Sequence, residues 1–150
     1  MPYPSAAQTG RGAQLYAGDG ATPTEGWDLT AEMLDISNAD PRVREMIDCT
    51  SQETPDGSEE KRPGMLKNGD FVFDCNYIPT HATHDGTTGL RADMVSGVLR
   101  HFRYVFPARN KRLAFSAFVS SFAIKNPVTD LLRATVTLTI TGVVTEEAHP

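Results

Sequence analysis

Cysteine is scarce in this sequence: its 150 residues include only Cys49 and Cys75. Two thiols do not make a disulfide scaffold, and the spacing of this pair fits neither a zinc site nor a redox pair. No local cysteine–histidine signature surrounds either thiol, which argues against a cysteine nucleophile. We therefore expect both cysteines to be reduced, buried and structural.

Long apolar runs are also missing. No run approaches the roughly 20 residues that a membrane-spanning helix needs. The first residues, Met1–Ser5, show neither the basic start nor the apolar stretch of a signal peptide. We expect a soluble protein that is made in a cytoplasm and has no membrane partner.

Positive charge is in deficit. The chain has 14 Lys and Arg against 19 Asp and Glu, which gives a net charge of −5. This balance argues against a protein that binds nucleic acid by neutralising phosphates. Twelve of the acids lie between Asp19 and Glu60, whereas six of the bases lie between Arg91 and Arg112. Either these two regions attract each other between copies, head to tail, or they are ordinary solvated surface.

Recognisable catalytic motifs are absent as well. The best lead is His81-Ala-Thr-His84-Asp85, with Cys75 and His101 nearby in sequence. Two histidines three residues apart can bind a metal if a third ligand converges, and a His–Asp pair can orient an imidazole. However, no helix holds both imidazoles on one side, and no carboxylate completes a facial triad. We predict no enzyme, cofactor or metal site, and we keep a small metal-dependent enzyme using His81 and His84 as an alternative.

What the sequence does have is a strongly alternating segment, Leu131–Val144. Its even positions are apolar, namely Leu132, Ala134, Val136, Leu138 and Ile140. Its odd positions are polar, namely Arg133, Thr135, Thr137, Thr139 and Thr141. Successive side chains of a strand point to opposite faces, so this pattern predicts a long strand with one buried face. The threonine face is left for water or a partner.

Shorter strands are predicted elsewhere, around Gln14–Tyr16, Glu32–Ile36, Val43–Asp48, Phe71–Ile78 and Arg112–Ile124. The last of these places Phe115, Phe118 and Phe122 on different faces under strict alternation. Either a bulge or twist brings them to one core, or both faces of the strand are covered. Leu90–Arg103 predicts the one helix, with an apolar stripe packed on the sheet and Thr87 or Thr88 as N-cap.

Two polar stretches complete the plan. Residues 1–24 predict an extended N-terminal arm with one or two short strands. Residues 50–68 predict a long, mobile polar loop, and loops of this length are commonly functional or disordered. We predict a single domain over residues 1–150 that is mainly β, a β-sandwich or small barrel with one flanking α-helix.

Two stretches carry most of a resemblance to a known family. Gly64–Phe73 forms the entry into a strand after a polar loop, and Leu113–Val144 leads from Phe115–Phe122 through Pro127 into the threonine-rich strand. In its order of strands, loops and helix, most of the chain resembles the major tail protein (tail tube protein) of long, non-contractile-tailed bacteriophages. The most telling part is Val136-Thr-Leu-Thr-Ile-Thr-Gly142.

The resemblance implies a non-enzymatic protein of the virion tail, assembled in the host cytoplasm. Its copies would close into homohexameric rings that stack into a tube around a tape-measure protein. The tube would meet a terminator and tip or initiator proteins at its ends, and DNA would pass through without sequence-specific binding.

Within this frame, two sets of residues are the candidate contacts. The polar loop is the expected inter-subunit stacking element, through Glu53, Pro55, Asp56, Glu59, Glu60, Lys61 and Arg62. The strand face formed by Thr135, Thr137, Thr139 and Thr141 is the expected wall of a channel or subunit seam. A subunit of a type VI secretion-like tube and a β-sandwich binding module from another part of a phage tail remain alternatives.

Overall fold

The computed structural model describes residues 5–20, 24–108 and 110–149. Parts of the expected N-terminal arm, residues 1–4 and 21–23, lie outside these ranges, as do Arg109 and Pro150. The described residues form β1 (Gln14–Gly18), β2 (Trp27–Leu29), β3 (Met33–Ile36), β4 (Val43–Asp48), β5 (Lys61–Lys67), β6 (Asp70–Asn76), α1 (Leu90–Ser96), β7 (Arg100–Val105), β8 (Lys111–Lys125) and β9 (Arg133–Ala148), with a 3₁₀ turn at Pro55–Gly57. Neither helical segment in these ranges has the length and apolar character needed to cross a membrane.

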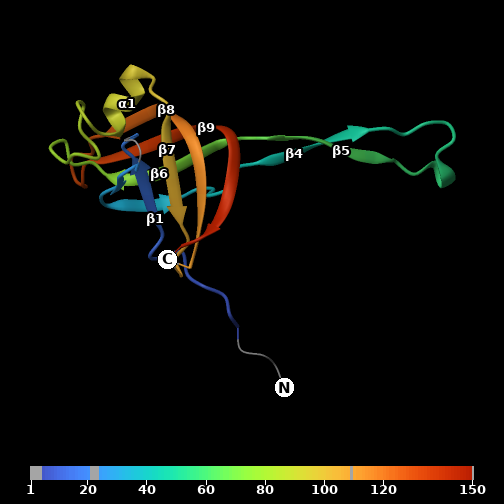
Figure 1. The fold of residues 1–150 in the computed structure, drawn as a ribbon, viewed down its shortest axis with the longest axis horizontal. Helices are drawn as coiled ribbons and strands as arrows, with labels where there is room; N and C mark the ends of the chain where they lie inside the picture. Colours follow the sequence, from blue (N-terminus) through green and yellow to red (C-terminus); the bar gives the residue numbers. More distant parts are fainter. Residues whose placement is uncertain (1–4, 21–23, 109, 150) are drawn as a thin grey trace.

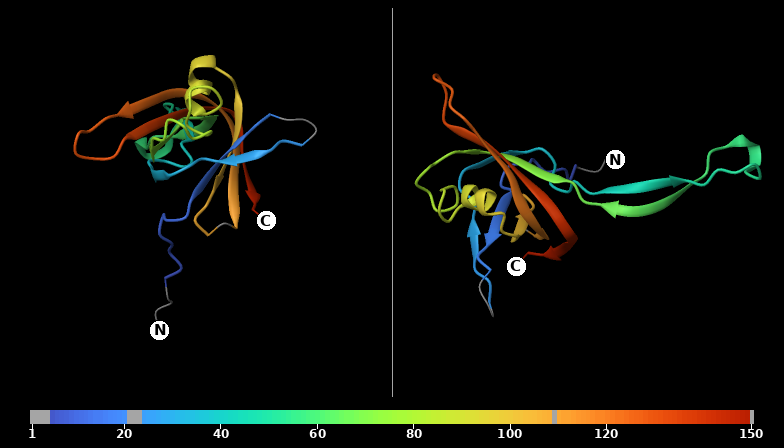
Figure 2. Two further views of the ribbon diagram at one scale, coloured as in Figure 1. Left: turned by 90° about the vertical axis from the view of Figure 1, so that its left-hand side faces the viewer. Right: turned by 90° about the horizontal axis from the view of Figure 1, so that it is seen from above.

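Seven of the strands form one antiparallel sheet that curls into a small, partly open barrel (Figures 1 and 2). Their order is β2-β1-β7-β8-β9-β6-β3, so β2 and β3 lie at opposite ends of the sheet. Only Thr30–Glu32 joins these two strands, and a link this short spans at most about 14 Å. Thr30 N–H donates to Leu15 O at 2.9 Å, and Asn76 N–H donates to Glu32 O at 3.1 Å. The ends of the sheet are therefore close together, and the predicted mainly β class is confirmed.

Aromatic side chains fill the interior of the barrel. The ring of Phe71 in β6 lies 5.6 Å from that of Phe115 in β8 and 5.7 Å from that of Tyr104 in β7, measured between centroids. Two strands separate β6 from β7 in the sheet, so these contacts cross the barrel. Other fully buried core residues include Leu15, Phe73, Cys75, Phe102, Val136 and Leu138. Each large apolar side chain buried in this way contributes roughly 1.5–3 kcal/mol to the stability of the barrel.

The alternation predicted for the last strand is confirmed. Ala134, Val136, Leu138 and Ile140 of β9 are buried, and the threonines between them are partly or fully exposed. The strand runs on to Ala148, beyond its predicted end, and pairs with β8 along most of its length. One face of β9 thus belongs to the core, and its other face stays outside.

A bulge in β8 accounts for its three phenylalanines. Ser120 is an extra residue between two successive pairs of the β8–β9 ladder. It shifts the alternation by one position, so that Phe115 and Phe122 both face the core. Phe118 lies on the outer face and is 39% exposed. Of the two explanations that the sequence left open, the bulge is the one found.

The helix is much shorter than predicted. It ends at Ser96 because Gly97 adopts a left-handed conformation, with φ of 73°. Arg100–Arg103, expected as the end of the helix, belongs to strand β7, which pairs with β1 and β8. The helical periodicity of apolar residues continues in the sequence beyond Gly97, but the helical conformation of the backbone ends before it.

The apolar stripe predicted for this helix is therefore wrong in its second half. Leu90 is buried at the start of α1. Val95, Val98 and Leu99 are 80%, 49% and 46% exposed, respectively. These three side chains face solvent where the prediction had them packed on the sheet.

The second part of the loop expected over residues 50–68 is a strand, β5, in a two-stranded ribbon. β4 pairs antiparallel with β5, and residues 49–60 connect them. The strand β4 was predicted, but β5 was missed because it contains Pro63 and Gly64. Proline is tolerated on the free edge of a ribbon because its missing N–H is not needed there. A Cβ at position 64 would lie 2.9 Å from Ile47 Cδ1, so glycine permits close packing of the neighbouring side chain.

The predicted N-terminal arm also divides. Residues 5–11 are exposed and extend away from the barrel (Figure 1). Gln14–Gly18, in contrast, is a sheet strand that pairs with β2 and β7. The short strand expected within this arm around Gln14–Tyr16 is therefore confirmed as β1.

Candidate functional site

The β4–β5 hairpin, residues 43–67, projects from the barrel as a long ribbon (Figures 1 and 2). Every residue of β4 is exposed, and only Gly64 of β5 is not. Five large apolar side chains are bare on this ribbon, namely Val43, Met46, Ile47, Met65 and Leu66, with exposures from 41% to 72%. Exposed apolar side chains gathered on a projecting element make this hairpin a candidate contact site.

These apolar side chains occupy both faces of the hairpin. Residues paired across an antiparallel ladder share a face. The register and alternation place Val43, Glu45, Ile47, Arg62, Met65 and Lys67 on one face, and Arg44, Met46, Asp48, Lys61, Pro63 and Leu66 on the other. The ion pair between Lys67 Nζ and Glu45 Oε2, at 3.6 Å, agrees with this assignment. Such a ribbon buries its apolar side chains only if both faces are covered.

The predicted stacking residues all lie in this hairpin. Glu53, Pro55, Asp56, Glu59 and Glu60 are exposed in its tip, residues 49–60, and Lys61 and Arg62 begin β5. The tip contains four acids and no base. Glu60 N–H donates to Thr50 Oγ1 at 2.8 Å, and Cys49 N–H donates to Glu60 O at 3.0 Å. The hairpin therefore presents an acidic tip with a defined local structure.

The second candidate surface is the outer face of β8 and β9. It carries the four predicted threonines, Thr135, Thr137, Thr139 and Thr141. Arg112 and Glu147 lie at one end of this face, and Lys125 and Arg133 lie at the other. Between those ends, the outward side chains of the two strands carry no charge. Between its two charged ends, this face is therefore uncharged and rich in β-favouring threonine.

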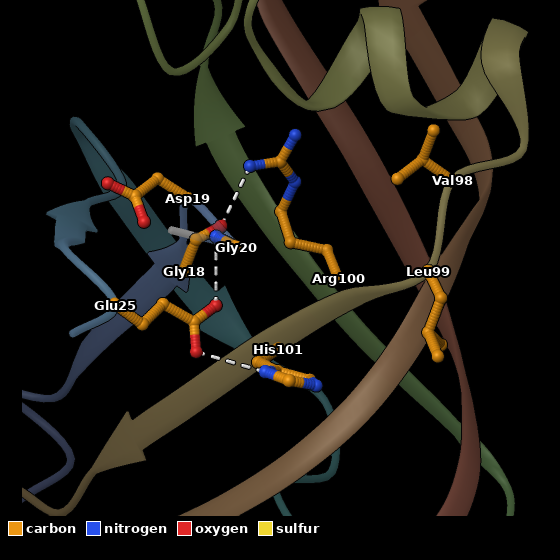
Figure 3. A pocket seen from close by; sticks show the side chains of 8 residues that line it. All are labelled: Gly18, Asp19, Gly20, Glu25, Val98, Leu99, Arg100 and His101. Atoms are coloured by element: carbon orange, nitrogen blue, oxygen red, sulfur yellow. Dashed lines mark hydrogen bonds and ion pairs between the residues drawn. The ribbon is translucent and has the colours of Figure 1, made fainter. Parts of the chain in front are cut away.

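Most basic side chains of the region from Arg91 to Arg112 have partners within their own chain. Arg100 Nη2 donates to Asp93 Oδ1 at 2.7 Å, its Nε lies 2.6 Å from Asp93 Oδ2, and its Nη1 donates to Gly18 O at 2.8 Å. His101 Nδ1 lies 3.0 Å from Glu25 Oε2 (Figure 3). These contacts line a small hollow between the β1–β2 turn and the start of β7 (Figure 3).

Two further bases follow the same pattern. Arg112 Nη2 lies 2.8 Å from Glu147 Oε2, and the guanidinium of Arg103 stacks 3.8 Å from the ring centroid of Trp27. Because these cations have partners inside the chain, the predicted head-to-tail attraction between an acidic and a basic region loses its support here. The alternative, ordinary surface charge, fits this segment better.

The histidine lead does not form a metal centre. His84 is fully buried and uses both ring nitrogens: Nδ1 accepts from Ile78 N–H at 3.2 Å, and Nε2 donates to Ala31 O at 3.0 Å. Burial lowers the pKa of His84, which favours this neutral form. Among the described residues, no group of three His, Cys, Asp or Glu side chains is placed to hold a metal ion. His84 instead links Ile78, after β6, to Ala31, between β2 and β3, where the barrel closes.

Asp85 is not the orienting partner of His84 either. Its Oδ1 accepts from Thr88 N–H at 2.7 Å and from Gly89 N–H at 2.9 Å. These hydrogen bonds, the one from Thr88 first, lower the pKa of Asp85 to about 2. The N-cap residue of α1 is Gly89, so the predicted caps Thr87 and Thr88 are wrong. The Asp85 carboxylate organises the turn that precedes the helix.

The cysteines are both unpaired in the structure. Cys75 is buried in the core, as predicted, and burial raises the pKa of its thiol to about 11. A thiol with that pKa is almost wholly protonated at neutral pH and is a poor nucleophile. Cys49 lies in the hairpin and is partly exposed, so the prediction of burial is wrong for this residue.

Several solved structures share this fold at low sequence identity. No protein-family model matches the sequence, and no curated protein matches it. A chain from the virion of a native gene transfer agent particle has a TM-score of 0.74 at 14% identity, covering 95% of this chain and 100% of that one. A chain of the SPP1 tail tube has a TM-score of 0.69 at 13% identity, covering 94% of this chain and 79% of that one.

The similarity extends to contractile systems. A chain from the sheath–tube complex of an extracellular contractile injection system, PVC, has a TM-score of 0.60 at 14% identity, covering 91% of this chain and 88% of that one. At these identities the likeness concerns the fold. The chain has the fold found in the SPP1 tail tube, which confirms the fold that the resemblance implied.

Proposed function

We propose that this chain is a structural subunit of a virion tail tube. The observation that carries the proposal is the match to the SPP1 tail tube over 94% of the chain. The projecting hairpin with two apolar faces supports it, because a monomer would leave that surface bare. The proposed subunit is non-catalytic, because His84 and Cys75 are buried in the barrel and the described residues bring no reaction centre together.

In this proposal, copies of the chain close into hexameric rings that stack into a tube. One similar chain comes from the tail of an empty gene transfer agent particle with C6 symmetry, with a TM-score of 0.74. A ring requires a heterologous interface that closes by rotation, and a stack requires a second one between ring faces. The neutral threonine face, Thr135 to Thr141, forms the channel wall or the lateral seam.

The hairpin makes the contacts between stacked rings. Its tip and the beginning of β5, Glu53 to Arg62, reach furthest from the barrel (Figure 1). The negative net charge and the uncharged outer face let DNA pass without being held.

The tube is assembled in the host cytoplasm around a tape-measure protein and joins terminator and tip proteins at its ends. Similar chains come from an AFP tube-terminating cap and from a PVC sheath/tube terminator, with TM-scores of 0.64 and 0.61. Chains of this fold therefore occur in structures of tubes and in structures that include a terminator or cap. The likeness to the PVC sheath–tube complex favours a second candidate, the inner tube of a contractile injection or secretion system.

Electron microscopy of the concentrated, purified protein tests the proposal. We expect hollow rings or tubes of constant width. Uniformly small particles at every concentration would contradict a tube subunit and favour a binding module instead. Metal analysis of the same protein, with His84→Ala as the comparison, tests the enzymatic alternative; a stoichiometric metal that is lost in the variant would overturn the non-catalytic assignment.

A further inference from the structure

Two short legs join the β4–β5 hairpin to the barrel: residues 37–42 lead into β4, and residues 68–69 lead out of β5. The legs lie against each other, because a Cβ at Gly69 would be only 2.5 Å from Pro41 O, so glycine is required there. Pro41 is buried, and Gly69 O accepts from Ile140 N–H at 3.4 Å. The two legs therefore form one packed unit against the barrel.

A side chain from each leg is bound to β9. Arg42, the last residue before β4, donates from Nη1 to Val144 O at 3.4 Å. Asn68, the first residue after β5, donates from Nδ2 to Gly142 O at 2.8 Å. Figure 1 shows both legs leaving the barrel beside β9. The hairpin is thus held at both sides of its base by the same strand.

Strand β9 is irregular at the point where the legs bind it. Its ladder with β6 ends at the pair Asp70–Thr139. In the ladder with β8, residues 142–144 of β9 lie opposite Phe115 alone, and Gly142 has a φ of 80°. A bulge of this kind leaves backbone groups outside the ladder, and such groups need other partners. The bulge therefore supplies the two carbonyl oxygens that the legs bind.

The Arg42 guanidinium is oriented before it meets β9. Its Nε donates to Asp40 Oδ1 and its Nη2 donates to Asp40 Oδ2, both at 2.7 Å. A bidentate pair of this kind fixes the plane of the guanidinium. Nη1 is left to donate to the β9 carbonyl. Asp40 lies in the same leg as Arg42, so this leg carries its own support for the contact.

We infer that Arg42 and Asn68 are positioning residues that hold the hairpin in one direction relative to the barrel. This inference deepens the proposed function and rests on it in one respect: the direction of the hairpin is the direction in which the stacking contact is presented to another copy. A contact element that is already held in place loses less conformational entropy when it binds.

Spin labels measure the direction of the hairpin. In a Cys49→Ser background, Arg62→Cys places one label on β5 and Lys125→Cys places the other at the end of β8, both at exposed positions. Cys75 is fully buried and stays unlabelled in the folded protein. Double electron–electron resonance on dilute, monomeric protein gives the distribution of distances between the two labels. We expect a single narrow peak.

Two substitutions release the legs. Arg42→Ala removes one donor to β9, and Asn68→Asp turns the other into a carboxylate that faces the Gly142 carbonyl. We expect the double variant to lose the narrow peak while the urea midpoint of the barrel stays unchanged, because neither side chain is buried. Arg44→Ala and Gln52→Glu make the same changes of charge within the hairpin and should keep the peak.

Three results would overturn the inference. The first is a narrow peak in the double variant, and the second is a broad distribution in the parent protein. The third is a lowered urea midpoint with an unchanged peak, which would mean that Arg42 and Asn68 only stabilise the barrel. These measurements use monomers, so they do not depend on tube formation.

Electron microscopy and light scattering of the concentrated protein separate the inference from the proposed function. A parent protein that forms no tubes contradicts the tube function, whereas the label distances still decide whether the hairpin is held. Where the parent forms tubes, we expect slower growth from the double variant. Equal rates of growth would overturn the link between the direction of the hairpin and stacking, and would leave the tube function standing.

Discussion

The barrel and the hairpin are both antiparallel β-structure, but the barrel buries its apolar side chains and the hairpin leaves them exposed. In the barrel, the sheet curls over its own aromatic side chains, and Phe71, Phe73 and Phe102 are fully buried. In the hairpin, every residue of β4 is exposed and no second layer is present. A two-stranded ribbon alone is marginally stable in water. The barrel therefore buries its apolar side chains within one chain, whereas those of the hairpin stay exposed in the single chain.

The largest expected effect is on the barrel. Val136→Asp places a carboxylate at a fully buried core position without any hydrogen-bonding partner. We expect a loss of at least about 4 kcal/mol in the free energy of unfolding, enough to unfold a typical domain. Circular dichroism during urea titration measures it. A stable, folded Val136→Asp protein would mean that the inner face of β9 has been misassigned.

The hairpin should show the reverse behaviour. Deleting Glu53–Arg62 removes the tip and the first pairs of β5 but touches no core residue. We expect the urea midpoint of the barrel to stay unchanged while tube formation, followed by electron microscopy, is abolished. Ser58→Ala, within the same exposed tip, is the control and should assemble normally. Normal tubes from the deletion variant would contradict a role of the hairpin tip in assembly.

A smaller effect is expected from acid, at the corner that closes the barrel. The neutral Nδ1 of His84 accepts from Ile78 N–H, and protonation would replace this acceptor by a donor. Burial lowers the pKa of His84 below its ordinary value of 6.5, so the unfolded chain takes up the proton first. The stability is therefore complete above pH 6.5 and falls toward the lowered pKa, by at most about 1.4 kcal/mol per pH unit.

Urea titrations at a series of pH values check this dependence. The His84→Gln variant should have a lower free energy of unfolding at high pH than the parent protein. Between pH 6.5 and pH 5, however, its free energy of unfolding should fall much less than that of the parent. His101→Gln, at an exposed histidine, should retain the decline. An identical slope in the parent protein and in His84→Gln would show that another group is responsible.

The smallest effect is expected on the outer face of the barrel. Thr137→Ser removes one partly exposed methyl group and keeps the hydroxyl. We expect a change within about 0.5 kcal/mol in the free energy of unfolding. A loss approaching that of Val136→Asp would show that the two faces of β9 are reversed.

The parts of the fold that could be predicted from the sequence are strands with one exposed face and one buried face. Phe71–Ile78 and Leu131–Val144 alternate cleanly, and β6 and β9 lie there. β4 was also found, but its partner β5 was missed because Pro63 and Gly64 are poor strand formers. Trp27–Leu29 was missed as β2 because a three-residue edge strand carries too little periodicity to detect.

The candidate site was predicted in outline. The polar character of residues 50–68 indicated an assembly element, and its acidic tip indeed projects from the barrel. The apolar side chains of the same hairpin, Met46 and Ile47 in particular, were not singled out. Two adjacent apolar residues on a strand point to opposite faces, and that was the available signal. Val95, Val98 and Leu99 were predicted to pack on the sheet because the helical periodicity of apolar residues continued through Gly97.

The bulge at Ser120 has a consequence for how such a protein changes over generations. Loss of this single codon would leave Phe115 and Phe122 facing the core, because the ladder with β9 would simply run without the extra residue. The local bend and added twist that a bulge imposes would be lost. The curvature of the subunit can thus be altered by one codon while every residue of the interior stays the same.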